Sequence, residues 1–409
     1  MSSHSTITKP TDITVPAGSW FAKLPMLGGA LGLIGLGAVL ALGSGEHGDR
    51  AMFSYLWAFI IMLSLVLGAL GWVLIEHAVR AQWSGVLRRI GETMIATLPL
   101  FALLFIPIAT LGMHALYPWT HETDEVLEAK RWFLTVPFWL GRSVFYLVVW
   151  SLMGTIFHRL SVRQDSLGNN LAERDRISHT LRWMAAGGIF VWALTLSFGA
   201  IDWVMSLMPH WYSTIFGVYF FAASILSFFA FTTLIAMAMQ NAGMLKSAIT
   251  TEHYHDLGKY VFGFTIFWAY IAFSQFILIW YANIPEETEF FLIRVEGGWA
   301  PISYALPLVH FFIPFFYLLS RNVKRHRVGL ALGCIWTLVM HCLDMYWIIM
   351  PNFGAHGGES HFAPALSDFV ALIGMGGAFL AVFGIFLKKS AVVCINDPRL
   401  DESLVHENY

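Results

Sequence analysis

Ten long apolar segments run through this 409-residue chain and restrict what it can fold into. A helix needs about 20 mainly apolar residues to cross a membrane. The segments that meet this requirement are 24–43, 52–75, 93–117, 134–157, 184–208, 215–239, 259–283, 301–320, 328–350 and 367–387. No segments of alternating hydrophobicity indicate barrel strands, so only helices can satisfy the backbone in lipid. The sequence therefore predicts an all-α polytopic membrane protein of about ten transmembrane helices.

Composition excludes several other classes of protein. Only 12% of the residues are charged and 57% are hydrophobic, whereas a soluble domain has about 25% charged residues. The net charge of −2 argues against a nucleic-acid partner, which requires a strongly basic surface. The three cysteines, Cys334, Cys342 and Cys394, form no C-x-x-C motif, so the chain has no ligand set of its own for an iron–sulfur cluster or c-type haem.

Histidines in the apolar segments or directly beside them do not form the facing pairs that haem b requires. They are His77, His114, His158, His310 and His341. We therefore expect this chain to bind no haem, iron–sulfur cluster or metal.

Basic residues are distributed unevenly between the two sides of the membrane. Of the 24 Lys and Arg residues, nineteen fall on the side that holds both termini, four fall on the other side, and Arg142 lies within a helix. Lys and Arg resist translocation, so this count predicts that both termini are cytoplasmic. Residues 1–20 lack the basic and apolar regions of a cleaved signal peptide, so we expect them to be retained.

An internal duplication relates the fifth and ninth segments. Asp202 is followed after five residues by Met208-Pro209, and Asp344 is followed after five residues by Met350-Pro351. The offset is four helices, an even number, so the repeats are parallel. We expect two four-helix bundles, two flanking helices and two cytoplasmic tails, at 52–208 and 215–350, 24–43 and 367–387, and 1–23 and 388–409 respectively.

Glycines in the first segment predict close helix packing. Gly28 and Gly32 have the small-xxx-small spacing that lets two helices approach closely. The partner helix is either in another chain or in this one.

Charged groups inside the spans are the first candidates for function, because such a group costs about 2.5–3.5 kcal/mol at a helix centre. Asp202 and Asp344 lie at matching depth near the outer face, and each bundle also has a basic group at similar depth, Arg142 in the first and His310 in the second. One interpretation is a proton-accepting site in each bundle. The alternative is a buried ion pair that only fixes the helix register.

His341 precedes Asp344 by three residues, so the two share a helix face. An imidazole beside a carboxylate can relay protons, although a lone helical histidine is equally often only hydrogen-bonded. His114 and the pair 274–275 either line the same cavity or pack, and we favour packing for His114.

Polar groups also occur toward the cytoplasmic side of the spans. Glu76 and His77 end the second segment, Glu92 precedes the third, and hydroxyl groups follow at Thr97, Thr232, Thr233 and Thr265. These residues form either an inner half-channel or ordinary interfacial groups. We favour the second interpretation, because charge costs least at the ends of spans.

Several polar runs carry a resemblance to a known family. They are DLGK at 256–259, FWAY at 267–270, FSQF at 273–276, IWYANIPEET at 279–288, DWVMSL at 202–207 and PHWYST at 209–214. With these runs, nearly the whole chain resembles the large membrane subunits of alternative complex III. Those subunits are similar to the NrfD and polysulfide-reductase membrane anchors, and the short termini resemble those of the second, ActF-type, subunit.

The resemblance implies a bacterial inner-membrane subunit of a quinol-oxidising complex that uses menaquinol or ubiquinol. Its partners would be an iron–sulfur protein, c-type cytochromes, a second homologous anchor and the quinone pool. In that family the first anchor is credited with the quinol pocket, and the second with proton conduction. Asp202 and Asp344 would then be proton acceptors, tuned by Arg142, His310 and His341.

Three functions remain open from the sequence. The chain contributes a quinol-facing cavity with a proton pathway, or it conducts protons with no quinone site of its own, or it is a purely structural anchor.

Overall fold

The computed structural model describes residues 10–45, 48–168, 170–355 and 361–407. The predicted tail residues 1–9 and 408–409 lie outside this part. All regular elements in the described part are helical, and ten helical segments are long and apolar enough to cross a membrane. The prediction of an all-α polytopic membrane protein is therefore confirmed.

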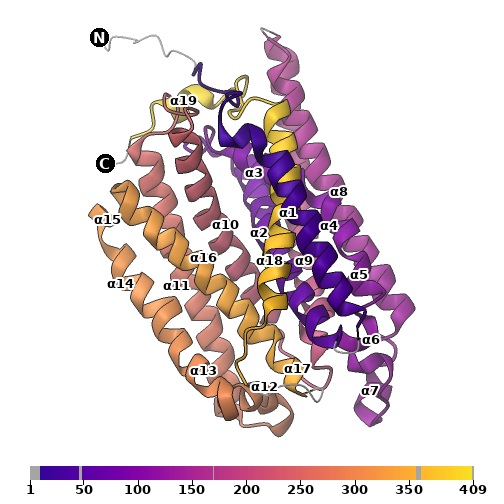
Figure 1. Ribbon diagram of the computed structural model, residues 1–409. Helices are drawn as coiled ribbons and strands as arrows, with labels where there is room; N and C mark the ends of the chain where they lie inside the picture. The colour runs from indigo at the N-terminus through magenta and orange to yellow at the C-terminus, as the bar shows by residue number, and fades with distance from the viewer. Residues whose placement is uncertain (1–9, 46–47, 169, 356–360, 408–409) are drawn as a thin grey trace.

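Seven of the ten spans are built on one long helix each (Figure 1). These helices are α1 (Trp20–Gly43), α2 (Gly48–Val79), α8 (Val136–Asp165), α9 (Leu171–Trp203), α10 (Phe216–Asn241), α11 (Thr251–Ala282) and α18 (Leu366–Lys389). The ninth span joins α16 (Arg327–Ile349) to the short α17 (Pro351–Ala355). The other short helices are α6 (Met113–Leu116), α7 (Glu125–Lys130), α12 (Pro285–Val295), α15 (Arg321–Arg325) and α19 (Leu400–Leu404).

Prolines break the two remaining spans. The third span, expected at 93–117, runs instead over Arg88–Ala109 as α3 (Arg88–Ile95), α4 (Leu98–Leu104) and α5 (Ile106–Ala109). The eighth span is divided into α13 (Ala300–Leu306), a π-helical turn η4 (Pro307–Phe312) and α14 (Ile313–Leu319). Pro99, Pro107, Pro307 and Pro314 begin the new pieces, because proline lacks the N–H that would continue the preceding turn.

The spans form two four-helix bundles and a flanking pair. The first bundle contains α2, α3–α5, α8 and α9, and the second contains α10, α11, α13–α14 and α16 in the same order. The bundles meet where α2 packs along α10. Helices α1 and α18 lie side by side and cover α2 (Figure 1).

The glycines of α1 pack within the same chain. A Cβ atom on Gly28 would lie 2.7 Å from the backbone of Gly377 and Ala381 in α18, and one on Gly32 would lie 2.9 Å from the backbone of Ala378. Larger residues at these positions would separate the two helices. Helix α18 of this chain is therefore the partner that the glycine spacing predicts.

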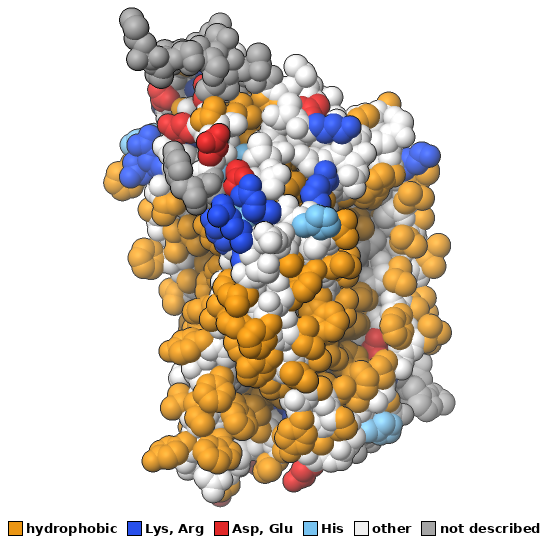
Figure 2. Space-filling view, turned by 90° about the vertical axis from the view of Figure 1, so that its left-hand side faces the viewer, with side chains coloured by type: hydrophobic (Ala, Val, Ile, Leu, Met, Phe, Trp, Pro, Cys, Tyr) orange, Lys and Arg blue, Asp and Glu red, His pale blue; other side chains and the backbone are white. Residues whose placement is uncertain are grey.

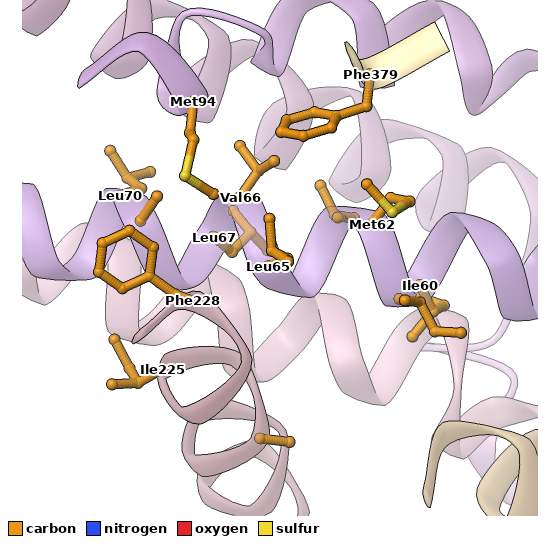
Figure 3. Close-up of a cluster of buried hydrophobic side chains, with 14 of the residues drawn as sticks. Ile60, Met62, Leu65, Val66, Leu67, Leu70, Met94, Ile225, Phe228 and Phe379 are labelled. Atoms are coloured by element: carbon orange, nitrogen blue, oxygen red, sulfur yellow. The ribbon is translucent and has the colours of Figure 1, made fainter. Parts of the chain in front are cut away.

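Helix α2 is the centre of the apolar core. Figure 3 shows its side chains, including Val66 and Leu70, among Met94 of α3, Phe228 of α10 and Phe379 of α18. Helix α10 approaches α2 closely at Gly68, where an added Cβ would lie 2.2 Å from the carbonyl oxygen of Ser224. The position of α10 therefore depends on the missing side chain at Gly68.

The two ends of the molecule differ in charge and in the segments that cover them. Both termini and α19 lie at one end, which we call the terminal face, and α7, α12 and α17 lie at the other, which we call the opposite face (Figure 1). Figure 2 shows Lys and Arg gathered toward the terminal face, with a broad apolar band below them. The two tails meet at the terminal face, where the backbone N–H of Val392 donates to the carbonyl of Ile13 at 2.8 Å.

Candidate functional site

Asp202 forms a bidentate ion pair with Arg142 inside the first bundle. It lies on the last turn of α9 and is fully buried. Arg142 of α8 donates from Nη2 to Oδ1 at 2.7 Å and from Nε to Oδ2 at 2.9 Å. The hydroxyl of Tyr146, one turn further along α8, donates to Oδ2 at 2.9 Å. The expected basic partner is thus present, and both carboxylate oxygens are occupied.

Arg142 is itself fixed at the opposite face. Its Nη1 donates to the carbonyl of Phe133 at 3.0 Å. Its guanidinium lies 3.7 Å from the ring centroid of Phe133 and 4.4 Å from that of Phe138, distances at which cation–π attraction is favourable. Only 12% of the Arg142 side chain is exposed. The pair is therefore rigid and largely shielded from the surroundings.

Aromatic side chains seal the Asp202 site from within. The indole N–H of Trp139 donates to the Asp202 carbonyl at 2.7 Å, and that of Trp203 donates to the Ser143 hydroxyl at 2.9 Å. Trp139, Trp150 and Trp203 are all buried. The Trp139 donor satisfies a carbonyl at the end of α9, the Trp203 donor joins α9 to α8, and the rings fill the space around the ion pair.

Asp344 of α16 is held without an ion pair. It is fully buried, and its carboxylate accepts from the Tyr219 hydroxyl of α10 and from the Trp268 indole of α11 at 3.1 Å. Among the residues that the structure describes, no Lys, Arg or His forms a salt bridge with it. Asp344 can therefore change its charge without leaving a buried cation unpaired.

His310 is linked to this carboxylate only through Trp268 in the described part of the chain. Its ring stacks on the ring of Trp268 with centroids 3.7 Å apart, and Trp268 is the residue that donates to Asp344. His310 is 2% exposed, and neither of its ring nitrogens has a hydrogen-bond partner in the described part of the chain. It lies on the π-helical turn η4, and such turns are frequent at functional sites.

His341 points away from Asp344 although the two share a helix. Its Nε2 lies 2.9 Å from the Ser64 hydroxyl of α2, so it connects the second bundle to the first. The expected direct contact between His341 and Asp344 is not formed. Residues three apart on a helix share a face, but their side chains can still diverge toward different neighbours.

The other polar groups predicted near the opposite face are less central. His114 is exposed and stacks on His121, with centroids 4.1 Å apart. Gln275 is buried and accepts from the Ser213 hydroxyl at 3.0 Å. In the part of the chain that the structure describes, neither residue forms a hydrogen bond with Asp202 or Asp344.

A basic residue outside the spans binds carbonyl groups near the end of α16 in one bundle and in the loop after α9 in the other, and the sequence did not single out either one. Lys130 of α7 donates to the Pro209 carbonyl at 2.6 Å. Arg294 of α12 is fully buried and donates to the Trp347 and Ile348 carbonyls at 3.0 and 2.6 Å. Both occupy the short helix before the third span of their bundle. That shared position is the signal that could have identified them.

Glu76, His77 and Glu92 are deeply buried near the terminal face. They were expected to be interfacial groups. Glu92 instead pairs with Arg88 at 3.0 Å and lies 3.5 Å from Arg89. All of these residues belong to one ionic cluster beneath the C-terminal tail.

The C-terminal tail closes this cluster. Asp397 pairs with Arg88 and Arg399. Burial acts to raise the pKa of Asp397, but the two guanidinium groups outweigh burial and hold it below its usual value. Burial raises the pKa of the Cys394 thiol to about 11, so the thiol stays protonated and unreactive at neutral pH. The sequence alone did not predict this cluster, because it forms only where the C-terminal tail folds over α3.

Comparison with known protein families and with curated proteins finds no match to this chain.

Proposed function

We propose that this chain handles protons as an integral membrane subunit of a quinol-oxidising respiratory complex of the alternative complex III type, in the second, ActF-type, position. The observation that carries the proposal is the environment of Asp344. Within the described part of the chain, it is fully buried near the opposite face, is held by neutral donors only, and lies one aromatic ring away from a buried histidine whose ring nitrogens have no hydrogen-bond partner. Ionisable groups at such positions are typical of proton pathways.

The chemistry at this site is a reversible proton transfer. When Asp344 is ionised, it accepts from Tyr219 and Trp268. When it gains a proton, one of its oxygens becomes a donor, and the tyrosine hydroxyl can turn to accept, because a hydroxyl serves in both roles. His310 has the same versatility, since a neutral imidazole has one donor and one acceptor nitrogen.

Asp202 has a different role in the proposal. Its partner Arg142 keeps its charge under all ordinary conditions and cannot relay a proton. Proton uptake by Asp202 would leave a buried guanidinium unpaired, which is strongly unfavourable. We assign Asp202 and Arg142 to a fixed ion pair that orients α8 and α9 and sets the local field, and Asp344 to the proton acceptor.

The geometry favours proton conduction over quinol oxidation in this chain. Donors of the same chain occupy the carboxylates of both Asp202 and Asp344, so a quinol head group would have to displace them. We therefore place menaquinol or ubiquinol at the other homologous anchor, which occupies the first position, and the redox centres in the iron–sulfur and c-type cytochrome partners. Both termini are placed in the cytoplasm, with the opposite face outward.

The test separates electron transfer from proton release. In the intact complex reconstituted into vesicles, Asp344→Asn should preserve quinol-to-acceptor electron transfer and lower the number of protons released per electron. The amide oxygen can still accept from Trp268, and the Tyr219 hydroxyl can turn to accept from the amide NH2 group, so both contacts and the fold are kept. Glu122→Gln, an exposed carboxylate toward the same face, is the control and should change neither quantity.

Two outcomes would contradict the proposal. Unchanged proton release in Asp344→Asn and Asp202→Asn would favour a purely structural anchor. A quinone head group within about 3 Å of either aspartate in a density map, which is hydrogen-bond reach, would favour a quinol site in this chain.

A further inference from the structure

A polar pocket lies at the terminal face, apart from both aspartate sites. It has a volume of about 400 Å³ and is lined by Gln240, Asn241, Lys246 and Arg327. Asn241 is the last residue of the sixth span, and Arg327 is the first residue of the ninth. The pocket therefore lies where two spans end, which is the level of the lipid head groups. Its volume is within the range of small-molecule sites.

The two cations of the pocket have no carboxylate partner. Within the described part of the chain, neither Lys246 nor Arg327 forms a salt bridge, and the Lys246 ammonium forms no hydrogen bond. Arg327 donates only from Nη2, to the Met237 carbonyl at 3.3 Å and to the side-chain oxygen of Asn241 at 3.2 Å. The Nε and Nη1 groups of Arg327 donate to no described residue. The pocket therefore combines a net positive charge with donors that the described chain does not use.

The loop that carries Lys246 is held in one conformation by side chains around it. Gln240 is 7% exposed and donates from Nε2 to the Leu245 and Ile249 carbonyls at 3.1 and 2.8 Å. The Asp12 carboxylate accepts from the backbone N–H of Lys246, and the same loop also occupies its second oxygen. Asp12 therefore anchors the loop backbone and leaves the Lys246 ammonium free. A fixed backbone at Lys246 lowers the entropic cost of binding a ligand.

Apolar side chains continue from the pocket along both helices. On α10, Leu234 precedes Asn241 by seven residues. On α16, Ala331 and Ile335 follow Arg327 by four and eight residues. These spacings put each apolar residue on the same helix face as the pocket residue above it. All three are at least partly exposed, and α10 packs against α16, so an acyl chain can lie on this surface below the pocket.

We propose that this pocket binds the phosphate of one anionic phospholipid of the phosphatidylglycerol class. Lys246 and Arg327 bind the phosphate oxygens, since ammonium and guanidinium groups form strong charge-assisted hydrogen bonds to phosphate. The acyl chains lie on the accessible apolar side chains of α10 and α16. A zwitterionic lipid would bring its own ammonium group beside two unpaired cations, so a lipid with a net negative charge is preferred. Basic pockets between membrane helices bind anionic head groups in the same way.

The experiment measures lipid binding to the full-length chain by native mass spectrometry. The protein is purified in a mild detergent and titrated separately with phosphatidylglycerol, phosphatidylethanolamine and inorganic phosphate. We expect one phosphatidylglycerol to bind about tenfold more tightly than phosphatidylethanolamine. Inorganic phosphate should not bind in the same concentration range, because it lacks the acyl chains. Lys246→Gln should weaken binding of phosphatidylglycerol about fivefold through the loss of one charge, and Lys246→Arg should preserve it.

Lys23→Gln is the matched control. Lys23 is an exposed lysine near the start of the first span and does not line the pocket, so this variant should bind like the wild type. Lys246 is exposed, and we expect every variant to melt at the wild-type temperature. Equal affinity of the two glutamine variants, equal affinity for the two lipids, or tighter binding of inorganic phosphate would each overturn the proposal. None of these results bears on proton release through Asp344, so the two proposals fail independently.

Discussion

Asp202 in the first bundle and Asp344 in the second occupy the same place in the repeated sequence, yet a guanidinium holds the first and neutral donors hold the second. The two acids have different partners because the helices that face them, α8 in the first bundle and the eighth span in the second, carry different side chains. Tyr146 and His310 each lie nine residues after the proline near the start of their helix, Pro137 or Pro301. Tyr146 donates to its aspartate, while His310, which lies on the π-helical turn, stacks on Trp268.

This comparison shows how a duplicated fold can separate two roles of one residue type. A carboxylate paired with arginine stabilises the position of two helices and keeps its charge. A carboxylate among neutral donors is free to exchange a proton. Two acids at the same depth in the membrane can therefore differ in whether they exchange protons, because their hydrogen-bond and ion-pair partners determine this.

The largest effect is expected from breaking the ion pair of the first bundle. Arg142→Met leaves the buried Asp202 carboxylate without its cation, which should destabilise the protein by about 3–5 kcal/mol. Adding Asp202→Asn to the same chain removes the uncompensated charge and should restore most of the loss. Thermal unfolding in detergent measures both effects. If Arg142→Met melts like the wild type, the pair is not the fixed element that distinguishes the first bundle.

Arg294 and Lys130 allow a second comparison. Arg294→Met leaves the Trp347 carbonyl near the end of α16 without its donor, while the Ile348 carbonyl keeps the Asn352 amide. It should cost about 2 kcal/mol, since a buried unsatisfied group costs about 1–3 kcal/mol. Lys130→Met should cost about 1 kcal/mol, because Lys130 is only partly buried and water can replace its bond. Unfolding of both variants under one condition gives the difference. An equal or reversed order would show that Arg294 is not the more important of the two residues.

The fold was largely predictable, because the length of an apolar segment and the thickness of a bilayer are directly related. The Asp-Met-Pro repeat also located Asp202 and Asp344, and depth alone was enough to associate Arg142 with Asp202. The same argument did not find the partners of Asp344. Depth along a helix does not give the rotation of a side chain about the helix axis, and the π-helical turn changes that rotation at His310.

Two parts of the site could not be predicted for other physical reasons. Tyr219 and Trp268 are neutral and common in membrane helices, so composition did not distinguish them from packing residues. The ionic cluster near the terminal face depends on a contact between Arg88 and Asp397, which are 309 positions apart in the chain. The sequence does not show where the C-terminal tail folds, so the charged groups at the ends of the spans were expected to be ordinary interfacial groups.

A smaller effect should separate the two tyrosines. Tyr219→Phe removes one of two donors to Asp344 and should destabilise the protein by about 1.5–3 kcal/mol, the range for hydrogen bonds to charged groups. Tyr146→Phe should cost about 1 kcal/mol, because Arg142 still occupies both oxygens of Asp202. Thermal unfolding again measures the difference, and proton release should fall only in Tyr219→Phe. Equal proton release in the two variants would remove the functional distinction between the bundles.

The smallest signal is a single vibrational band, and it tests the comparison most directly. A carboxyl group that exchanges a proton gains and loses a C=O stretching band as the pH changes, whereas a permanently ionised carboxylate shows no such change. Infrared difference spectra of the purified chain should therefore contain a pH-dependent carboxyl band that disappears in Asp344→Asn and persists in Asp202→Asn. Arg142 explains the second result, because protonating Asp202 would leave a buried guanidinium unpaired. If the band disappears in Asp202→Asn instead, the first bundle contains the proton acceptor, and the roles assigned to the two acids must be exchanged.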